Sequence, residues 1–229
     1  MSASTPTIVF DLDGTLVDTA ADLVASLNHA LTTAGYEPEP YAAMRPYVGH
    51  GARAMIERVH AARRIALPQS DLDALLAAFL DHYAKNIPSR SAPYPGALAM
   101  LDRFAERGYR LAVCTNKREA LADELLGALD MAPRFAAICG ADTFPFRKPD
   151  PRHLTQTVLR AGGAVECAVM VGDSRTDIDT AKAAGVPVIA VDHGYSDRHV
   201  GDFEPSAVIS HFDELTPDFA DRMIRAVAN

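Results

Sequence analysis

The N-terminal stretch of residues 7–18, TIVFDLDGTLVD, joins a short apolar run to a pair of acidic residues. Its first four residues are apolar or β-branched, which is typical of a buried strand. Asp11 and Asp13 follow where that strand ends, and Gly14 permits a tight turn that brings the backbone close to a ligand. The stretch therefore predicts a buried strand with two carboxyl groups at its end.

Similar apolar runs recur along the chain and alternate with helical patterns. Further strands are expected at residues 110–115, 168–171 and 186–191, with a weaker candidate at 135–139. Residues 95–107 and 176–184 repeat apolar side chains at helical spacing, and Gly108 and Gly185 stand where these helices are expected to end. This alternation predicts right-handed βαβ units. We therefore expect an α/β fold, a Rossmann-like parallel sheet with helices on both faces.

Only helical patterns occur between Asp18 and about Arg90. Ser70 and Asp73 form an expected capping pair before one apolar stripe, and Gly35 ends another. The stripes consist of Leu72, Leu75, Leu76, Phe79, Leu80 and Tyr83, and of Leu23, Leu27, Ala30, Leu31 and Ala34. We therefore expect an α-helical cap domain over residues 18–92, inserted into an α/β core domain formed by residues 1–17 and 93–229.

The composition excludes several classes of protein. The 22 basic and 30 acidic residues give a net charge of −8, which disfavours broad binding to nucleic acid. No apolar run approaches the roughly 18 residues that a membrane span needs. A secretory signal would carry a basic residue near its start, and no Lys or Arg precedes Arg45. Cys114, Cys139 and Cys167 lie far apart, as expected of buried, reduced thiols. We expect a cytoplasmic protein that binds neither membrane nor nucleic acid.

The acidic pair at residues 11 and 13 suits metal-assisted catalysis. Two carboxylates this close repel each other unless a cation or a proton lies between them. With Mg²⁺ bound, one can stay ionised as a nucleophile while the other handles a proton. The alternative is a turn at the strand end with no chemical role.

Two later segments carry polar side chains that suit phosphate binding. Thr115 and Asn116 follow a predicted strand, where a hydroxyl and free backbone N–H groups can hold a phosphate. Lys148 precedes Pro149, and a lysine ahead of such a restricted turn can present a fixed cation to a phosphoryl group. The alternatives are helix capping by Thr115 or Asn116 and an exposed surface lysine.

Residues 172–177, GDSRTD, add acidic groups after the strand predicted at 168–171. Mg²⁺ prefers carboxylate oxygens combined with waters and phosphate, so Asp173 can supply a ligand and Asp177 can support the water shell. Alternatively, Asp173 or Ser174 caps the next helix and Asp177 faces solvent.

Four features follow one another along the chain: the DxDGT motif that begins at Asp11, then Thr115, then Lys148, and then the acidic motif at 172–177. In this order they resemble the haloacid dehalogenase superfamily of phosphatases. The resemblance covers nearly the whole chain, including the helical cap after the first motif. It implies that Asp11 attacks phosphorus and forms an aspartyl-phosphate. It also implies that Asp13 protonates the leaving oxygen and then activates water.

The same resemblance implies a cofactor and a set of phosphate-binding residues. Mg²⁺ is expected to bind the Asp11 side chain, the backbone carbonyl of Asp13 and the Asp173 carboxylate, with Asp177 in the outer sphere. The residues expected to hold the phosphoryl oxygens are Gly14, Thr115, Asn116 and Lys148.

Three features favour a phosphatase within the superfamily. Dehalogenases lack an acid at the position of Asp13. Mutases usually carry a histidine in the hinge, which here reads VDTAAD over residues 17–22. Phosphonatases use a cap lysine that lies earlier than Lys85, the first cap lysine of this chain.

Finer similarity is to the bacterial phosphoglycolate phosphatases, through the hinge, residues 45–52 (RPYVGHGA) and residues 140–151 (GADTFPFRKPDP). His50 departs from that pattern, and Arg45 or His50 is expected to meet a substrate carboxylate. The expected substrate is a small phosphorylated metabolite, 2-phosphoglycolate first, and the protein is expected to be a monomer or homodimer.

Several alternatives stay open at this point. N-acetylmuramic acid 6-phosphate or another sugar phosphate is a rival substrate, and a pyrophosphatase or a β-phosphoglucomutase-like mutase is a rival activity. A signalling module that keeps the phosphoryl group on Asp11 belongs to a different class. The long cap and the acid at position 13 disfavour it.

Overall fold

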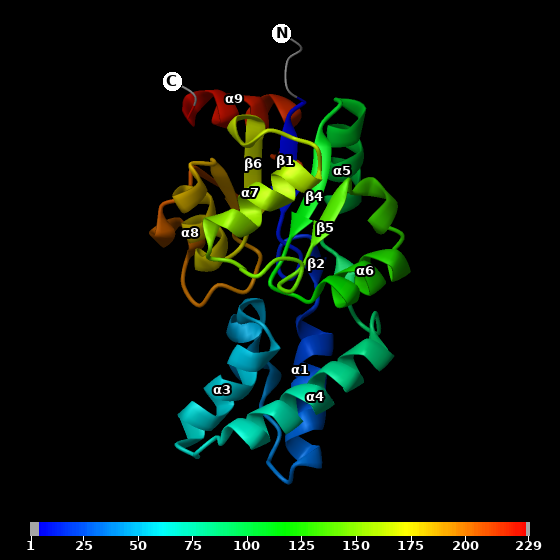
Figure 1. Cartoon of the computed structure of the whole chain (residues 1–229), viewed down its shortest axis with the longest axis vertical. Coiled ribbons are helices and arrows are strands. Elements are labelled where there is room, and N and C mark those ends of the chain that lie inside the picture. The colour runs from blue at the N-terminus through cyan, green and yellow to red at the C-terminus, as the bar shows by residue number, and fades with distance from the viewer. Residues whose placement is uncertain (1–4, 228–229) are drawn as a thin grey trace.

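The computed structural model describes residues 5–227 and contains a six-stranded parallel sheet (Figure 1). Across the sheet the strands are β5 (Ala137–Cys139), β4 (Arg110–Cys114), β1 (Thr7–Phe10), β6 (Ala168–Gly172), β7 (Val188–Val191) and β8 (Ala207–Ile209). Each neighbouring pair is parallel. The α/β fold and all the predicted strands are therefore confirmed. Strand β8 was not predicted, because it is a short edge strand whose middle residue, Val208, is exposed.

Strand β1 is buried on both faces and joins two hydrophobic layers. Ile8 and Phe10 pack into one core and Val9 into the other, because successive side chains of a strand point to opposite faces. The first layer contains α5 (Ala97–Glu106), α6 (Glu119–Ala128) and α9 (Pro217–Val227), and the second contains α7 (Pro151–Arg160) and α8 (Arg175–Ala184). Short 3₁₀ helices lie at Ala132–Arg134, Val165–Cys167 and Val200–Phe203.

The helices of residues 20–86 form a separate lobe below the sheet in Figure 1. They are α1 (Ala20–Thr33), α2 (Tyr41–Met44), the 3₁₀ helix Arg45–His50, α3 (Ala52–Arg63) and α4 (Gln69–Asn86). Their buried apolar side chains form a third core, in which both predicted stripes take part. We call residues 20–86 the helical lobe and residues 5–16 with 94–227 the sheet lobe.

A short antiparallel ladder connects the two lobes. Strand β2 (Val17–Asp18) pairs with β3 (Ala92–Pro93), so the two chain crossings lie side by side. The carboxylate of Asp22 then accepts hydrogen bonds from the backbone N–H groups of Ser89, Arg90 and Ser91 at 2.9–3.1 Å. The entry to the helical lobe and its exit are therefore tied together.

The expected helix caps have mixed outcomes. Ser174 caps α8, as the alternative interpretation of residues 172–177 expected, and Asp150 caps α7. Ser70 does not cap α4, because that helix begins at Gln69 and the Ser70 hydroxyl instead donates to Asp71. Thr115 and Asn116 do not cap α6, since Arg118 stands at its N-cap.

Two other expectations concern cysteines and membranes. Cys114 and Cys139 are buried as predicted, but Cys167 is half-buried at the end of a 3₁₀ helix, so the prediction for it was wrong. Across residues 5–227, no helix combines the length and apolarity that a membrane crossing requires.

The order of the strands determines where a site can form. From β1 the chain adds β4 and β5 on one side and β6, β7 and β8 on the other. The carboxyl end of β1 therefore lies where the connections diverge, which is the usual position of a ligand site in open α/β sheets.

Candidate active site

Four separated motifs converge at the carboxyl edge of the sheet. Asp11 follows β1, Thr115 follows β4 and Asp173 follows β6, and all three side chains are buried. Lys148 comes from the loop before α7 and is buried as well. Parallel neighbouring strands end at the same edge, so these residues meet although they lie far apart in sequence.

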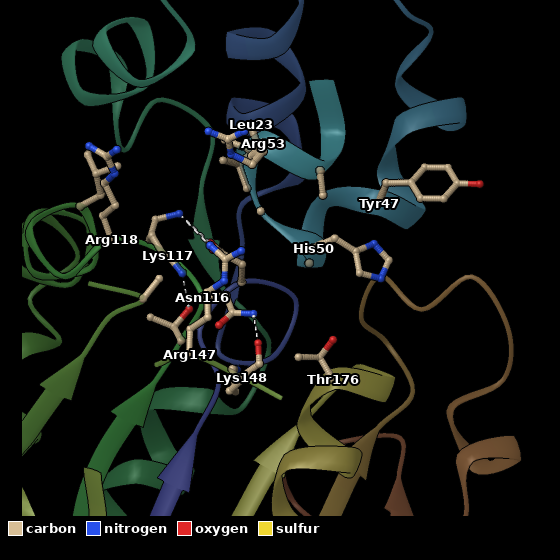
Figure 2. A pocket seen from close by; sticks show the side chains of 18 of the residues that line it. Leu23, Tyr47, His50, Arg53, Asn116, Lys117, Arg118, Arg147, Lys148 and Thr176 are labelled. Atoms are coloured by element: carbon tan, nitrogen blue, oxygen red, sulfur yellow. Dashed lines mark hydrogen bonds and ion pairs between the residues drawn. The ribbon is translucent and has the colours of Figure 1, made fainter. Parts of the chain in front are cut away.

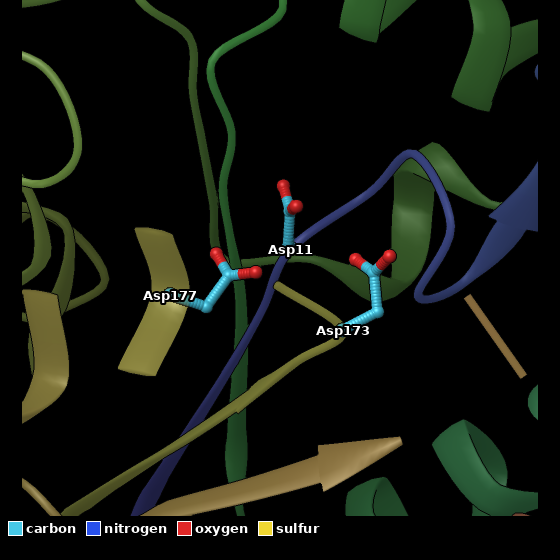
Figure 3. A group of neighbouring side chains, drawn as sticks. All are labelled: Asp11, Asp173 and Asp177. Atoms are coloured by element: carbon cyan, nitrogen blue, oxygen red, sulfur yellow. The ribbon is translucent and has the colours of Figure 1, made fainter. Parts of the chain in front are cut away.

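Three carboxyl groups form a cluster at this edge (Figure 3). Asp11, Asp173 and Asp177 each offer one oxygen, and these oxygens lie within 4.8 Å of one another. Asp177 reaches the cluster from the first turn of α8 and is fully buried, so the interpretation that it faces solvent is wrong.

The Asp173 carboxylate is held from two sides. The Thr15 hydroxyl donates to one oxygen at 3.0 Å, and the backbone N–H of Tyr195 donates to the other at 2.7 Å. A Cβ atom at Gly14 or Gly194 would collide with the Asp173 side chain, so both positions need glycine for this close approach. Gly14 also has a positive φ of 85°, a backbone conformation that favours glycine.

Lys148 connects two members of the acidic cluster. Its Nζ lies 2.9 Å from Asp11 and 2.6 Å from Asp177, and its side chain is 1% exposed. The Lys148 backbone N–H donates to Nδ1 of His153 at 3.2 Å. Burial, together with the nearby Lys148 charge, lowers the pKa of His153 to about 4, so this ring stays neutral and can accept that bond.

Asp177 has a structural role and an electrostatic one. One carboxylate oxygen pairs with Lys148, and the other accepts from the backbone N–H and hydroxyl of Ser174 in a capping box. Both oxygens are thus engaged by the protein. This arrangement fits an outer position around a metal rather than a direct ligand.

Burial makes ionisation of the three carboxyl groups energetically unfavourable unless a positive charge lies nearby. It raises the pKa of Asp11 to about 6, with repulsion from Asp177 adding to the shift and Lys148 offsetting part of it. Burial and the charges of Asp177 and Asp11 raise the pKa of Asp173 to about 8. Desolvation and neighbouring carboxylates both disfavour ionisation, so a bound cation would restore the charged forms.

The donor set fits Mg²⁺. Lys148 pairs with two of the three carboxyl groups, Asp11 and Asp177, and Asp11 Oδ1 is buried without a hydrogen bond of good geometry. Hard divalent cations take such oxygen ligands, with water and phosphate completing the shell.

Asp13 has separate partners from Asp11. Its two oxygens lie 2.9 and 3.0 Å from Nζ of Lys117, and the Thr19 hydroxyl donates to one of them at 2.7 Å. The two neighbouring acids are therefore paired with two different lysines, Asp11 with Lys148 and Asp13 with Lys117.

Thr115 and Asn116 lie in the turn after β4. The Thr115 backbone N–H donates to the carbonyl of Cys139 at 3.0 Å, and its hydroxyl accepts from the Lys117 N–H at 3.2 Å. The Asn116 side chain donates to the Lys148 carbonyl at 3.1 Å and so connects the two segments that are expected to bind phosphate. Both residues line the cavity described next.

A cavity of about 930 Å³ lies between the two lobes, with Asp11 and Asp13 among its lining residues (Figure 2). The sheet lobe contributes Asn116, Lys117, Arg118, Arg147 and Lys148, and the helical lobe contributes Leu23, Tyr47, His50, Arg53 and Tyr83. An apolar wall and converging cations suit an anionic small molecule.

The two residues expected to meet a substrate carboxylate lie in different places. His50 lines the cavity, but Arg45 does not. The Arg45 guanidinium donates to the His193 carbonyl at 3.2 Å and stacks over the Tyr195 ring at 5.1 Å. Its position therefore serves contact between the lobes.

Sequence reasoning missed Lys117, Tyr195 and Tyr83 as residues of the site. The hydroxyl of Tyr195 accepts from the N–H groups of Thr19 and Ala20 and so binds the hinge. Lys117 stands two residues after Thr115, and that proximity was the only available signal for it. Tyr83 was assigned only to an apolar stripe, because nothing local distinguishes it from its neighbours.

The comparisons agree with this geometry. The family model for haloacid dehalogenase-like hydrolases matches residues 8–191. A phosphoglycolate phosphatase of Mesorhizobium japonicum is 59% identical over 99% of this chain and 100% of its own, and one of Agrobacterium fabrum is 49% identical over 96% and 94%. A crystal structure titled a predicted phosphoglycolate phosphatase from Haemophilus somnus is 26% identical, covering 94% of this chain and 98% of its own, with a TM-score of 0.85.

The family match covers most of the chain, and the relatives match over nearly their full lengths. The matched region includes the acidic cluster, Thr115, Asn116 and Lys148. The chain belongs to the haloacid dehalogenase-like hydrolase family.

Proposed function

We propose that the protein is a Mg²⁺-dependent phosphatase that hydrolyses small phosphomonoesters, with 2-phosphoglycolate as its substrate. The observation that carries this proposal is the buried cluster of Asp11, Asp173 and Asp177 beside Lys148, at one end of a cavity lined by cations. The names of the relatives from Mesorhizobium japonicum and Agrobacterium fabrum support the substrate.

In the first half-reaction, a carboxylate oxygen of Asp11 attacks phosphorus. The bond from phosphorus to the substrate's alcohol oxygen breaks, and that oxygen takes a proton from Asp13. The products are an aspartyl-phosphate and the free alcohol. Lys148, 2.9 Å from Asp11, orients the nucleophile and neutralises charge on the phosphoryl oxygens.

In the second half-reaction, water attacks the phosphorus of the aspartyl-phosphate. Asp13, now a carboxylate, takes the proton of that water, and the bond between phosphorus and the Asp11 oxygen breaks. Inorganic phosphate leaves, and both acids return to their starting forms. Thr115, the Asn116 backbone and the turn at Gly14 hold the phosphoryl oxygens throughout.

Mg²⁺ would be held by the Asp11 carboxylate, the Asp13 backbone carbonyl and Asp173, with Asp177 in the outer sphere, and it would supply charge neutralisation at the phosphoryl group. Burial of these carboxyl groups is the physical reason for that assignment, because several uncompensated negative charges are unstable in a dry site.

We assign residues 18–92 as a cap domain and residues 1–17 with 93–229 as the catalytic domain. The separate core of the helical lobe and the paired crossings at β2 and β3 support these boundaries. The cavity between the lobes is larger than a two-carbon phosphate requires. Closure of the cap would exclude water from the reaction.

The test is phosphate release from p-nitrophenyl phosphate, with and without Mg²⁺, by the protein and by Asp11→Asn. Activity should require Mg²⁺ and fall by at least about 10³-fold in the variant. Release that survives Asp11→Asn would overturn the mechanism. A panel of 2-phosphoglycolate, sugar phosphates and pyrophosphate then tests the substrate. A sugar phosphate with a higher kcat/KM would replace 2-phosphoglycolate, and product isomerisation would indicate a mutase.

A further inference from the structure

Lys117 is a buried cation that the mechanism above does not use. Its side chain is 3% exposed, and its ammonium group lies within 3.0 Å of both oxygens of Asp13. Placing a lysine away from water is costly unless a charged partner and good geometry compensate. The pair is also specific, because Lys148 contacts Asp11 and Asp177 instead.

The backbone position of Lys117 is tied to the phosphate-binding turn. Its N–H donates to the hydroxyl of Thr115 at 3.2 Å, and its carbonyl accepts from the N–H of Ala141 at 2.8 Å. The lysine thus extends from a turn that is anchored on both sides. A cation held in this way can keep a short carboxylate side chain in one rotamer.

The helical lobe completes the surroundings of this ammonium group. The Tyr83 ring of α4 lies 4.4 Å from Nζ of Lys117, within the range of a cation–π contact. Tyr83 is 1% exposed, and its hydroxyl, which also lies close to Lys117, makes no hydrogen bond of good geometry among the described residues. Tyr83 therefore meets the sheet lobe at the Lys117 ammonium group.

We propose that Lys117 is a positioning residue that holds the Asp13 carboxylate at the reaction centre, and that Tyr83 fixes Lys117 when the helical lobe covers the sheet lobe. The proposal rests on the proposed function, because Asp13 is the acid–base group there. In this proposal Lys117 orients Asp13, and the position of Lys117 depends on the position of the helical lobe.

A competing role for Lys117 is direct binding of the substrate. In that case its ammonium group would leave Asp13 when substrate enters, and its loss would mainly raise KM. A positioning role predicts that loss of Lys117 mainly lowers kcat and leaves KM nearly unchanged, because substrate contacts remain while the proton-transferring group loses its orientation.

The first experiment measures kcat and KM for Lys117→Met and Lys117→Arg. We expect Met to lower kcat by about 10- to 100-fold with KM changed less than about threefold, and Arg to restore most of the loss. Lys85→Met is the matched control, since Lys85 also pairs with an aspartate at 2.8 Å but is exposed and outside the cavity. A rise in KM at constant kcat would overturn the proposal.

The second experiment places the same substitution in the Asp13→Asn background. If Lys117 acts through Asp13, Lys117→Met should reduce the residual activity by less than about threefold there. A full additional loss would show a role independent of Asp13 and overturn the proposal. Wild-type turnover and Asp11→Asn are measured in parallel. Failure of the phosphatase proposal appears in those two proteins, whereas failure of this inference leaves both as expected.

The third experiment tests the contribution of Tyr83. Tyr83→Leu removes the ring and should lower kcat several-fold, and Tyr83→Phe, which keeps the ring, should lower kcat less. In the Lys117→Met background the Leu substitution should add little. Equal losses in both backgrounds would overturn the role of Tyr83. Far-ultraviolet circular dichroism establishes whether each variant folds. If Lys117→Met does not fold, the kcat and KM values of the Lys117→Arg and Tyr83 variants, each relative to wild type, decide the question.

Discussion

Asp11 and Asp173 are carboxyl groups that the folded protein holds in a dry site. Burial raises the pKa of Asp173 to about 8, whereas an ordinary aspartate has a pKa of 3.8. At neutral pH the metal-free folded state therefore keeps a proton that the unfolded chain has already released. Since the folded state binds more protons, the free energy of unfolding falls as pH rises toward the folded pKa.

We therefore expect thermal unfolding in EDTA to shift to lower temperature between pH 6.5 and pH 8, and Mg²⁺ to reverse more of that loss at pH 8. His153, His82 and His193 have lowered pKa values and give the opposite slope, and this contribution diminishes as the pH rises above 6.5. Asp173→Asn is the control, because it removes the titrating group and should flatten the profile. An equal slope in both proteins would contradict the assignment.

Gly194 shows how a residue without a side chain can shape the proposed metal site. A Cβ atom there would collide with the Asp173 side chain. Gly194→Ala should therefore displace the carboxylate and weaken Mg²⁺ affinity by about 10-fold or more, measured by isothermal titration calorimetry. Gly127→Ala is the matched control, since a Cβ at Gly127 meets nothing within 4 Å. Unchanged affinity in Gly194→Ala would refute this account.

At the scale of secondary structure, the site depends on where strands end and helices begin. The N-terminus of α8 illustrates this, because Ser174 accepts from the Asp177 N–H while Asp177 accepts from the Ser174 N–H. This capping box orients the same carboxylate that pairs with Lys148 at 2.6 Å. A helix cap therefore also positions a residue of the acidic cluster.

Ser174→Ala should lower the free energy of unfolding by about 1 kcal/mol and reduce kcat, because the cap and the Asp177 orientation are lost together. Urea denaturation and steady-state kinetics measure the two effects. Ser70→Ala provides the comparison, since Ser70 lies in the first turn of α4 without capping it. A loss of similar size in Ser70→Ala would argue against the specific role of the cap.

At the scale of the whole molecule, two chain crossings connect the lobes. Asp22 is 5% exposed, and its carboxylate accepts hydrogen bonds from the N–H groups of Ser89, Arg90 and Ser91 and from the Ser91 hydroxyl. A single side chain at the entry of the helical lobe thus holds the backbone of its exit. This contact holds together the two chain crossings that connect the lobes.

Asp22→Ala should leave those backbone donors without their acceptor and lower the free energy of unfolding by about 1–3 kcal/mol. Hydrogen–deuterium exchange should accelerate at the amides of residues 89–91. Asp71→Ala is the control, because Asp71 is an exposed acid in the first turn of α4. Exchange at residues 89–91 that stays at the wild-type rate would exclude this role of Asp22.

Local patterns were sufficient for most of the elements and for the strand-end residues. Short β-branched runs, helical periodicity and glycines at helix ends predicted the parallel sheet and the helical insertion. Asp11, Thr115 and Asp173 could be located because each follows a strand, and parallel strands end at one edge. Strand β8 could not be predicted, since a three-residue edge strand carries almost no pattern of its own.

The amino-acid order by itself determined the fold class, the helical insertion and the motifs at the strand ends, because these follow from neighbours a few residues apart. Only the tertiary structure paired Lys117 with Asp13, directed Arg45 to His193 and brought Tyr83 over the lysine. These contacts join residues separated by more than 30 positions. The pair of Lys117 and Asp13 depends on how distant segments of the sheet lobe pack, and the other two contacts depend on how the two lobes pack. No local periodicity encodes that packing.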